Sequence, residues 1–251
     1  MSGKQMFLAG AVAAALFCAS QTQAQDYAFQ GFATADAMNQ MHAAMRDNMM
    51  EPSSQARAPT RGGAAASAAT QGRRATVQTT YRSSPAVSTR VRAQFAEFIE
   101  RTSGREAAER ARSAFQSGDP ITSWAGIVRE DGLRTGDLAD AMAAYWILNW
   151  IMANQGDNNR TQALAVRDQV RGVISGSPAV ARLGDAGRQE MAEVLMLNFL
   201  VQQATYVDAM QRGDQAMMRR LGDAAVARFR NEMGVDLRRL ELTDAGLVSA
   251  S

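Results

Sequence analysis

The chain has 251 residues, of which 46% are apolar and 21% charged, and a net charge of +2, so it is large enough for one or two globular domains. A disulfide scaffold is excluded because there is one cysteine. A multi-pass membrane protein is also excluded, because after the N-terminal stretch no apolar run reaches the roughly 20 residues that a transmembrane helix needs.

The first 24 residues have the pattern of a secretory signal peptide. Lys4 precedes an apolar stretch over 6–19, and Thr22 and Ala24 provide the small side chains of a cleavage site after Ala24. The alternative is an N-terminal membrane anchor, for which the apolar stretch is short. We therefore predict export by the general secretory route to the periplasm or beyond, with no membrane span after cleavage.

Residues 25–51 are predicted to form a Met-rich amphipathic segment. Four methionines recur at spacings of three, four and four, which places them on one face of a helix beside the single histidine: Met38, Met41, Met45, Met49 and His42. Thioether and imidazole ligands suit Cu(I), so one hypothesis is a copper site. The other is that the methionines pack against the main domain or a partner.

Residues 52–87 are predicted to be a disordered basic linker. From 52 to 92 there are seven arginines and no acidic residue, in a background rich in Ala, Ser, Thr and Gly. Such a segment cannot bury enough apolar surface to offset the entropy of ordering it. It is either a solvated linker or an electrostatic tether to an anionic envelope polymer. Nucleic acid is not expected as a partner, because Tyr81 is the only aromatic residue there.

Residues 88–251 are predicted to fold as an all-α, bundle-like domain. The most apolar helix is opened by Asp137 and contains the run 142–153, which is too short to span a membrane but suits a central helix. Turn and capping signals divide the rest of the domain into helices: Ser103-Gly104, Asp119-Pro120, 156–159, Ser177-Pro178, Gly184-Asp185, Gly213-Asp214 and Gly234.

Two asparagines stand among large apolar side chains of this domain. Burying a carboxamide without a hydrogen bond costs a few kcal/mol, so we predict that Asn149 and Asn198 bond to each other or to nearby backbone. The alternative is that both amides orient a ligand in a pocket lined by Tyr145, Trp146 and Trp150.

The residue types and motifs of common catalytic sites are scarce in this chain. Cys18 would leave with the signal peptide, His42 is the only histidine, and there is no phosphate-binding glycine loop. Glu130 with Asp131, or Glu190 with Glu193, could form a carboxylate pair, but such pairs are common on solvated helix faces. We expect no enzyme and no cofactor.

Three further segments carry a resemblance to a known family. They are Asp137-Leu138-Ala139-Asp140-Ala141, Arg188-Gln189 with Glu190 and Glu193, and the ending Gly234-Val235-Asp236-Leu237 through Leu242-Thr243-Asp244-Ala245-Gly246-Leu247. Over about residues 88–248 the chain resembles an uncharacterised family of exported proteobacterial proteins, a domain of unknown function. The resemblance implies an exported helical domain and adds no catalytic residue.

Two functions follow as expectations. The first is a non-enzymatic exported protein that binds an unidentified envelope protein or polymer, with the Met-rich helix and basic tether outside the folded core. The second is a protein that binds a small molecule or Cu(I). A carboxylate-dependent envelope hydrolase is the least favoured reading, and the sequence leaves the oligomeric state open.

Overall fold

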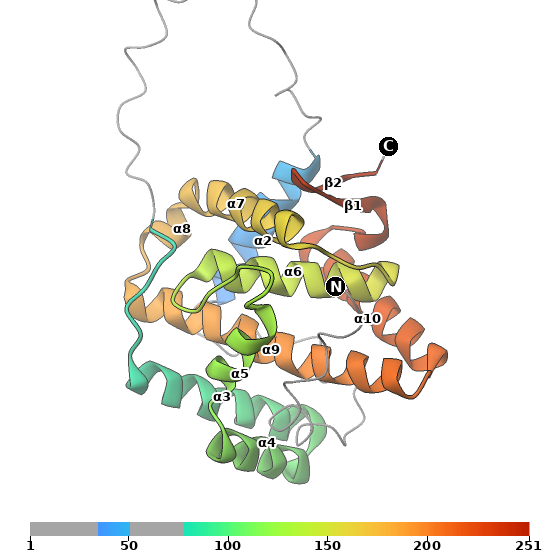
Figure 1. Cartoon of the computed structure of the whole chain (residues 1–251). Coiled ribbons are helices and arrows are strands. Elements are labelled where there is room, and N and C mark those ends of the chain that lie inside the picture. The colour runs from blue at the N-terminus through green and yellow to red at the C-terminus, as the bar shows by residue number, and fades with distance from the viewer. Residues whose placement is uncertain (1–34, 51–77, 251) are drawn as a thin grey trace, which may run out of the picture.

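The computed structural model describes residues 35–50 and 78–250, and in these ranges the chain is mostly helical. The described residues form nine α-helices around one hydrophobic core, and a short β-hairpin follows them. In Figure 1, α3 (Pro85–Ser103) and α4 (Arg105–Ser117) lie at one end, followed by α9 (Asp185–Gln211), α6 (Leu138–Asn154) and α7 (Arg160–Ser175). The predicted all-α, multi-helix class is confirmed.

The central helix is α6, against which α7, α9 and α10 (Gln215–Met233) all pack. Asp137 caps its N-terminus by accepting a hydrogen bond from the Ala139 amide at 2.9 Å. Every residue from 138 to 149 is buried, so this helix has no polar face, as its composition predicts.

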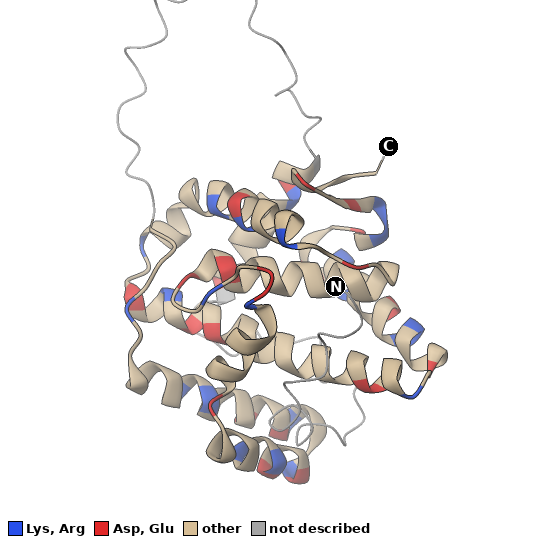
Figure 2. Ribbon diagram, viewed as in Figure 1, with Lys and Arg blue, Asp and Glu red and all other residues tan. Residues whose placement is uncertain are grey.

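The longest helix is α9, with 27 residues. The helix has no charged residue between Glu193 and Asp208. In Figure 2 its charged residues, coloured blue and red, lie toward its two ends. The apolar middle packs against α3, α5 (Pro120–Val128), α6 and α10. Together α6 and α9 form an apolar double layer at the centre of the domain.

The predicted starts and breaks of the other helices are confirmed. Gly104, with φ of 87°, separates α3 from α4. Asp119 caps α5, Ser177 caps α8 (Pro178–Ala181) and Asp214 caps α10, each by accepting hydrogen bonds from backbone amides. These short polar side chains satisfy amide groups that the first helical turn leaves without a partner.

The C-terminal hairpin was not predicted. Strands β1 (Leu240–Thr243) and β2 (Gly246–Ser249) follow a 3₁₀ turn (Leu237–Arg239) and pair antiparallel, with Leu242 opposite Leu247. Gln169 of α7 accepts from the Leu247 amide at 3.0 Å and donates to its carbonyl at 2.9 Å. Its side chain therefore pairs with backbone groups at the edge of β2 that do not face β1. Strands of four residues are too short for alternation to be recognised in a sequence.

Helix α2 (Ala35–Met50) belongs to the core of the domain. The buried side chains Met38, Met41, Met45 and Met49 belong to the hydrophobic core, and α2 packs against α7, α8, α10 and β2. The expectation that this helix lies outside the folded core is therefore wrong. The stripe reflects docking on the domain, for which flexible methionine side chains are well suited.

The last residues of the predicted linker are also part of the fold. Thr79 is buried and accepts from the Leu138 amide at 3.0 Å, while the Tyr81 amide donates to Gly136 at 2.9 Å. Helix α3 then begins at Pro85, three residues before the predicted boundary at 88. The linker prediction fails over 78–87 because backbone pairing with the turn before α6 orders a segment that has few apolar side chains.

Two other predictions fall on parts of the chain that the structure leaves undescribed. The signal peptide, 1–24, and the greater part of the basic linker, 52–77, lie outside the described residues. Within 35–50 and 78–250, no helix is both long enough and apolar enough to traverse a bilayer.

Gly222 marks the close approach of α10 to α6. A Cβ atom at this position would lie 2.5 Å from the Met152 carbonyl oxygen, whereas one on Gly172 of α7 would meet no atom within 4 Å. We expect Gly222→Ala to lower the free energy of unfolding by about 1–3 kcal/mol. Gly172→Ala, the matched control, should raise it by up to about 1 kcal/mol, because alanine has the higher helix propensity. Urea unfolding measures both, and equal effects would contradict this packing.

Candidate functional site

An apolar pocket of about 280 Å³ lies among α5, α6, α9 and the start of α10. Its apolar walls come from all four helices and from the turn after α5. The apolar lining residues are Ile127, Val128, Leu133, Ala144, Ile147, Leu148, Ile151, Phe199, Met210 and Met218.

The two long walls follow from helical periodicity. On α6 the lining residues are 144, 147, 148 and 151, and on α9 they are 199, 203, 206 and 210. Spacings of three and four residues place each set on one helix face, so two neighbouring helices present a continuous face to the pocket.

One end of the pocket is polar. There the loop 155–158 meets the turn after α5, and the Asn158 side chain donates to Asp131 Oδ1 at 2.9 Å. Asn158 is buried and Asp131 half-buried, while Asp157 adds a second carboxylate to the lining. Gln203 and Tyr206 of α9 also reach the pocket. The site therefore combines a large apolar wall with a few polar groups.

Burial changes the ionisation of two pocket residues. It raises the pKa of the Asp131 carboxyl above its ordinary value, although the hydrogen bond from Asn158 acts in the opposite direction. Burial also raises the pKa of Tyr206. Groups with shifted pKa values inside a cavity are typical of functional sites, although structural networks produce them as well.

The aromatic residues predicted to line a ligand pocket lie elsewhere on α6. Tyr145, Trp146 and Trp150 are absent from the lining of this pocket, as are Asn149 and Asn198. The Trp150 indole instead donates to the Leu240 carbonyl at 2.8 Å and ties α6 to the hairpin. The residues named from the sequence therefore lie on two helices that form this pocket, α6 and α9, but not on the faces that line it.

Both asparagines bond to nearby backbone, which was one of the two predicted arrangements. Asn149 donates to the Tyr145 carbonyl and Asn198 to the Val194 carbonyl, each at 2.8 Å. Asn149 also accepts from Arg228 Nη2 of α10 at 2.5 Å. Arg228 is only 2% exposed, and no carboxylate among the described residues lies within ion-pair distance of it.

Arg228 was missed by sequence reasoning, although a signal was present. It lies seven residues after Leu221 and three after Ala225, on the face of α10 that faces the core. Its neighbour Phe229 packs edge-on against Trp146, with ring centroids 4.8 Å apart. An arginine on an apolar helix face is a candidate for burial.

His42 and the methionine stripe join this same core. The His42 ring is 1% exposed and lies edge-on to Trp146, with centroids 6.0 Å apart. Burial lowers the pKa of His42 to about 3. Met41 and Met45 are fully buried, so a Cu(I) ion would reach them only after these side chains move. No cluster of three or more His, Cys, Asp or Glu side chains fit for a metal occurs in the described ranges, and the copper hypothesis stays a prediction.

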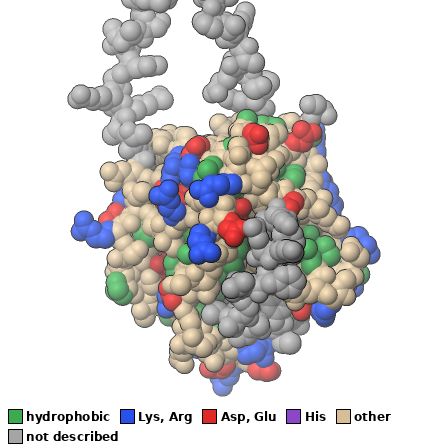
Figure 3. Space-filling model, viewed as in Figure 1, with side chains coloured by type: hydrophobic (Ala, Val, Ile, Leu, Met, Phe, Trp, Pro, Cys, Tyr) green, Lys and Arg blue, Asp and Glu red, His purple; other side chains and the backbone are tan. Residues whose placement is uncertain are grey.

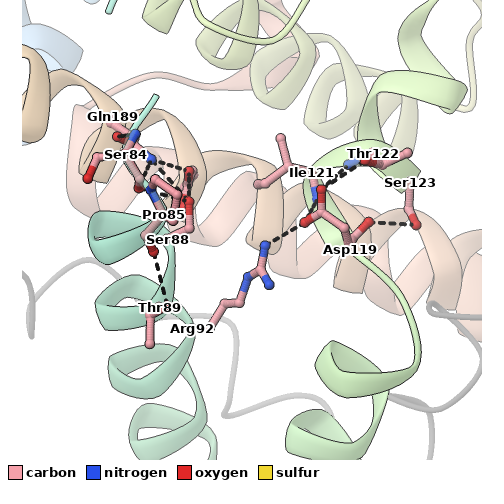
Figure 4. A network of polar contacts seen from close by, with 11 residues as sticks. Ser84, Pro85, Ser88, Thr89, Arg92, Asp119, Ile121, Thr122, Ser123 and Gln189 are labelled. Atoms are coloured by element: carbon pink, nitrogen blue, oxygen red, sulfur yellow. Dashed lines mark hydrogen bonds and ion pairs between the residues drawn. The ribbon is translucent and has the colours of Figure 1, made fainter. Parts of the chain in front are cut away.

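The carboxylates considered for catalysis mainly join helices. Glu193 accepts from Ser88 Oγ at 2.7 Å and from Gln189 Nε2 at 2.8 Å. Figure 4 shows Ser84, Ser88 and Gln189 between α3 and α9, with Arg92 extending to Asp119 nearby.

Contacts with other helices explain the positions of Glu190 and Glu193, one of the two predicted acid pairs. Glu190 pairs with Arg90 at 3.0 Å, so both members of the pair Glu190 and Glu193 bridge α9 to α3. Glu130 is exposed and does not line the pocket. Asp131 is the one predicted carboxylate that does.

A second group of charges lies at the start of α6. Arg171 contacts Asp137 at 2.6 Å and Asp140 at 3.4 Å, and Figure 3 shows basic and acidic side chains mixed over this side of the molecule. Burial, reinforced by the charge of Asp137, raises the pKa of Asp140 to about 6. None of these three residues lines the apolar pocket.

Comparison with known proteins gives one match. A family model described as "Family of unknown function (DUF6683)" matches residues 4–250, a longer range than the 88–248 indicated by the sequence motifs. No curated protein and no solved structure matches the chain.

Proposed function

The chain belongs to this family of unknown function, and from its pocket we propose that it is an exported, non-catalytic protein that binds a small, largely apolar molecule. The observation that carries the proposal is the pocket between α6 and α9. Ligand sites are typically concave and mostly apolar, with a few polar groups that orient the ligand. The volume of about 280 Å³ limits the occupant to a small molecule.

The lining favours binding over hydrolysis. Asp131 and Asp157 are the acids among the described lining residues, and most of the apolar residues around the cavity are aliphatic. Aliphatic walls offer a sugar ring few of the hydrogen bonds that its hydroxyl groups need. The chemistry of the site therefore supports retention of a ligand, and a carboxylate-dependent hydrolase receives no support from it.

The described surface favours a small ligand over a macromolecular partner. Among the described residues, Met210 is the one large apolar side chain classed as exposed, at 42%, and it lies on the pocket lining. Protein interfaces usually present a contiguous apolar patch with aromatic residues at its centre. Binding to an envelope protein or anionic polymer remains a prediction that depends on the basic segment.

Export rests on the sequence pattern of the first 24 residues. The positive start, the apolar core and the small residues before Gln25 support a signal peptide.

The binding proposal is tested by titrating the protein with 1-octanol and measuring the heat of binding. We expect a dissociation constant on the order of 0.1 mM, which corresponds to about 0.6 kcal/mol for each non-hydrogen atom of 1-octanol and lies within the usual range of ligand efficiency. Ile151→Trp places a larger side chain in the pocket and should abolish binding.

Ile121→Trp is the matched control for this titration. Ile121 is partly buried on α5 and lies outside the pocket lining, so the variant should bind like the original chain. Equal loss in both variants, or no binding to the original chain, would overturn the proposed function.

A further inference from the structure

The charged side chains that the described residues contribute to the pocket lining are all acidic. Asp131 and Asp157 contribute carboxylates to the lining, whereas no Arg, Lys or His is among the described lining residues. The other polar groups, Gln155, Asn158 and Gln203, are neutral amides. A ligand in the pocket therefore meets a negative end.

Asp131 lacks the arginine partner that two well-shielded carboxylates of this chain have. Asp137 and Glu190 each lie within 3.0 Å of an arginine nitrogen, whereas the buried Glu193 is held by Ser88 and Gln189. For Asp131, no arginine of the described residues comes within ion-pair distance, and the contact that the structure gives it is the amide of Asn158.

Arg160, the arginine beside the turn that holds Asp131, bonds to the backbone of that turn. Arg160 Nη1 donates to the Glu130 carbonyl at 3.2 Å, and its guanidinium lies against Gly132. It does not line the pocket. Asp131 therefore presents its negative charge to the cavity, where partial burial makes a positive partner more valuable than it would be in water.

We propose that the pocket selects amphipathic amines, whose ammonium group is held by Asp131 and whose apolar body lies between α6 and α9. This inference rests on the proposed function. The ammonium donates to the carboxylate, with Asn158 fixing the orientation of that carboxylate from its other side. A charge-assisted hydrogen bond is about twice as strong as a neutral one, and an anionic head group would be repelled by both acids.

Three probes with the same eight-carbon chain separate charge from apolar contact: n-octylammonium, 1-octanol and octanoate, each titrated into the full chain at pH 7. We expect octylammonium to bind about tenfold more tightly than 1-octanol and octanoate to bind most weakly. Asp131→Asn should weaken octylammonium by about tenfold and leave 1-octanol within about twofold. Retained binding of 1-octanol shows that the variant is folded.

Asp223→Asn is the matched control, because it removes the same charge from an exposed position of α10 outside the pocket. It should leave all three affinities unchanged. If 1-octanol binds but octylammonium binds no more tightly, or if Asp131→Asn and Asp223→Asn act alike, selection of amines is overturned while the binding function stands. If no probe binds, both fall.

Discussion

Replacing Asn149 with leucine is expected to lower the free energy of unfolding by about 3 kcal/mol, the largest effect of any single polar substitution proposed for this protein. Arg228 is 2% exposed and donates to Asn149 Oδ1. Leucine has a similar size but accepts no hydrogen bond, so the buried guanidinium would lose this acceptor. Chemical denaturation followed by circular dichroism measures the change.

Asn198→Leu provides the control in a closely similar context. Asn198 is buried in α9 and donates to the carbonyl four residues earlier, as Asn149 does, but no guanidinium of the described residues bonds to its oxygen. We expect it to cost less than about 1 kcal/mol, because the loss is one neutral hydrogen bond. Equal costs at the two positions would show that Arg228 does not depend on Asn149.

A double-mutant cycle isolates the contact between the two helices. Arg228→Met removes the charge, so adding Asn149→Leu to it should cost far less than Asn149→Leu alone. Additive effects of the two substitutions would contradict a coupled pair.

Acidification is expected to destabilise the protein through His42. In the unfolded chain the imidazole takes up a proton near its ordinary pKa of 6.5, whereas in the folded protein its pKa is about 3. Between pH 3 and pH 6.5 the unfolded state therefore binds more protons than the folded state. The contribution of His42 to the free energy of unfolding is complete above pH 6.5 and falls as the pH is lowered toward 3. At pH 4.5 the loss amounts to roughly 3 kcal/mol.

His42→Leu separates this effect from the titration of other groups. Asp140 acts in the opposite sense, since its pKa of about 6 in the folded protein exceeds its ordinary value of 3.8, and its contribution therefore declines as the pH rises from about 4 to 6. The stability difference between the original chain and His42→Leu should shift by roughly 3 kcal/mol between pH 7 and pH 4.5. A difference that is the same at both pH values would show that His42 titrates normally.

Helices and their starts were predictable because local chemistry determines them. Three helices begin after a short polar residue that is followed by an apolar or proline-led run: Asp119, Asp137 and Ser177. Each of these side chains accepts a hydrogen bond from a backbone amide of the first helical turn. Segment 78–84 was not predictable in this way, because pairing with the distant turn 136–138 orders it.

The pocket lay beyond sequence reasoning for a different reason. Helix α6 is apolar on all sides, so periodicity cannot distinguish the face of Ile147 and Ile151 from the face of Trp146. The aromatic residues named from the sequence do not line this cavity: Tyr145 and Trp146 are buried in the core, and Trp150 bonds to the hairpin. Asp131 was noted only as half of an acid pair, and its relation to Asn158 depends on two turns meeting in space.

Binding of a small apolar molecule in the pocket between α6 and α9 can be followed on the isoleucine methyl groups. The chain has six isoleucines. Three line the pocket, Ile127, Ile147 and Ile151, and three lie elsewhere, Ile99, Ile121 and Ile174. Titration with 1-octanol, followed by methyl NMR, should shift the first three resonances in a saturable manner and leave the other three in place. No saturable shift, or equal shifts of all six, would contradict binding in this pocket.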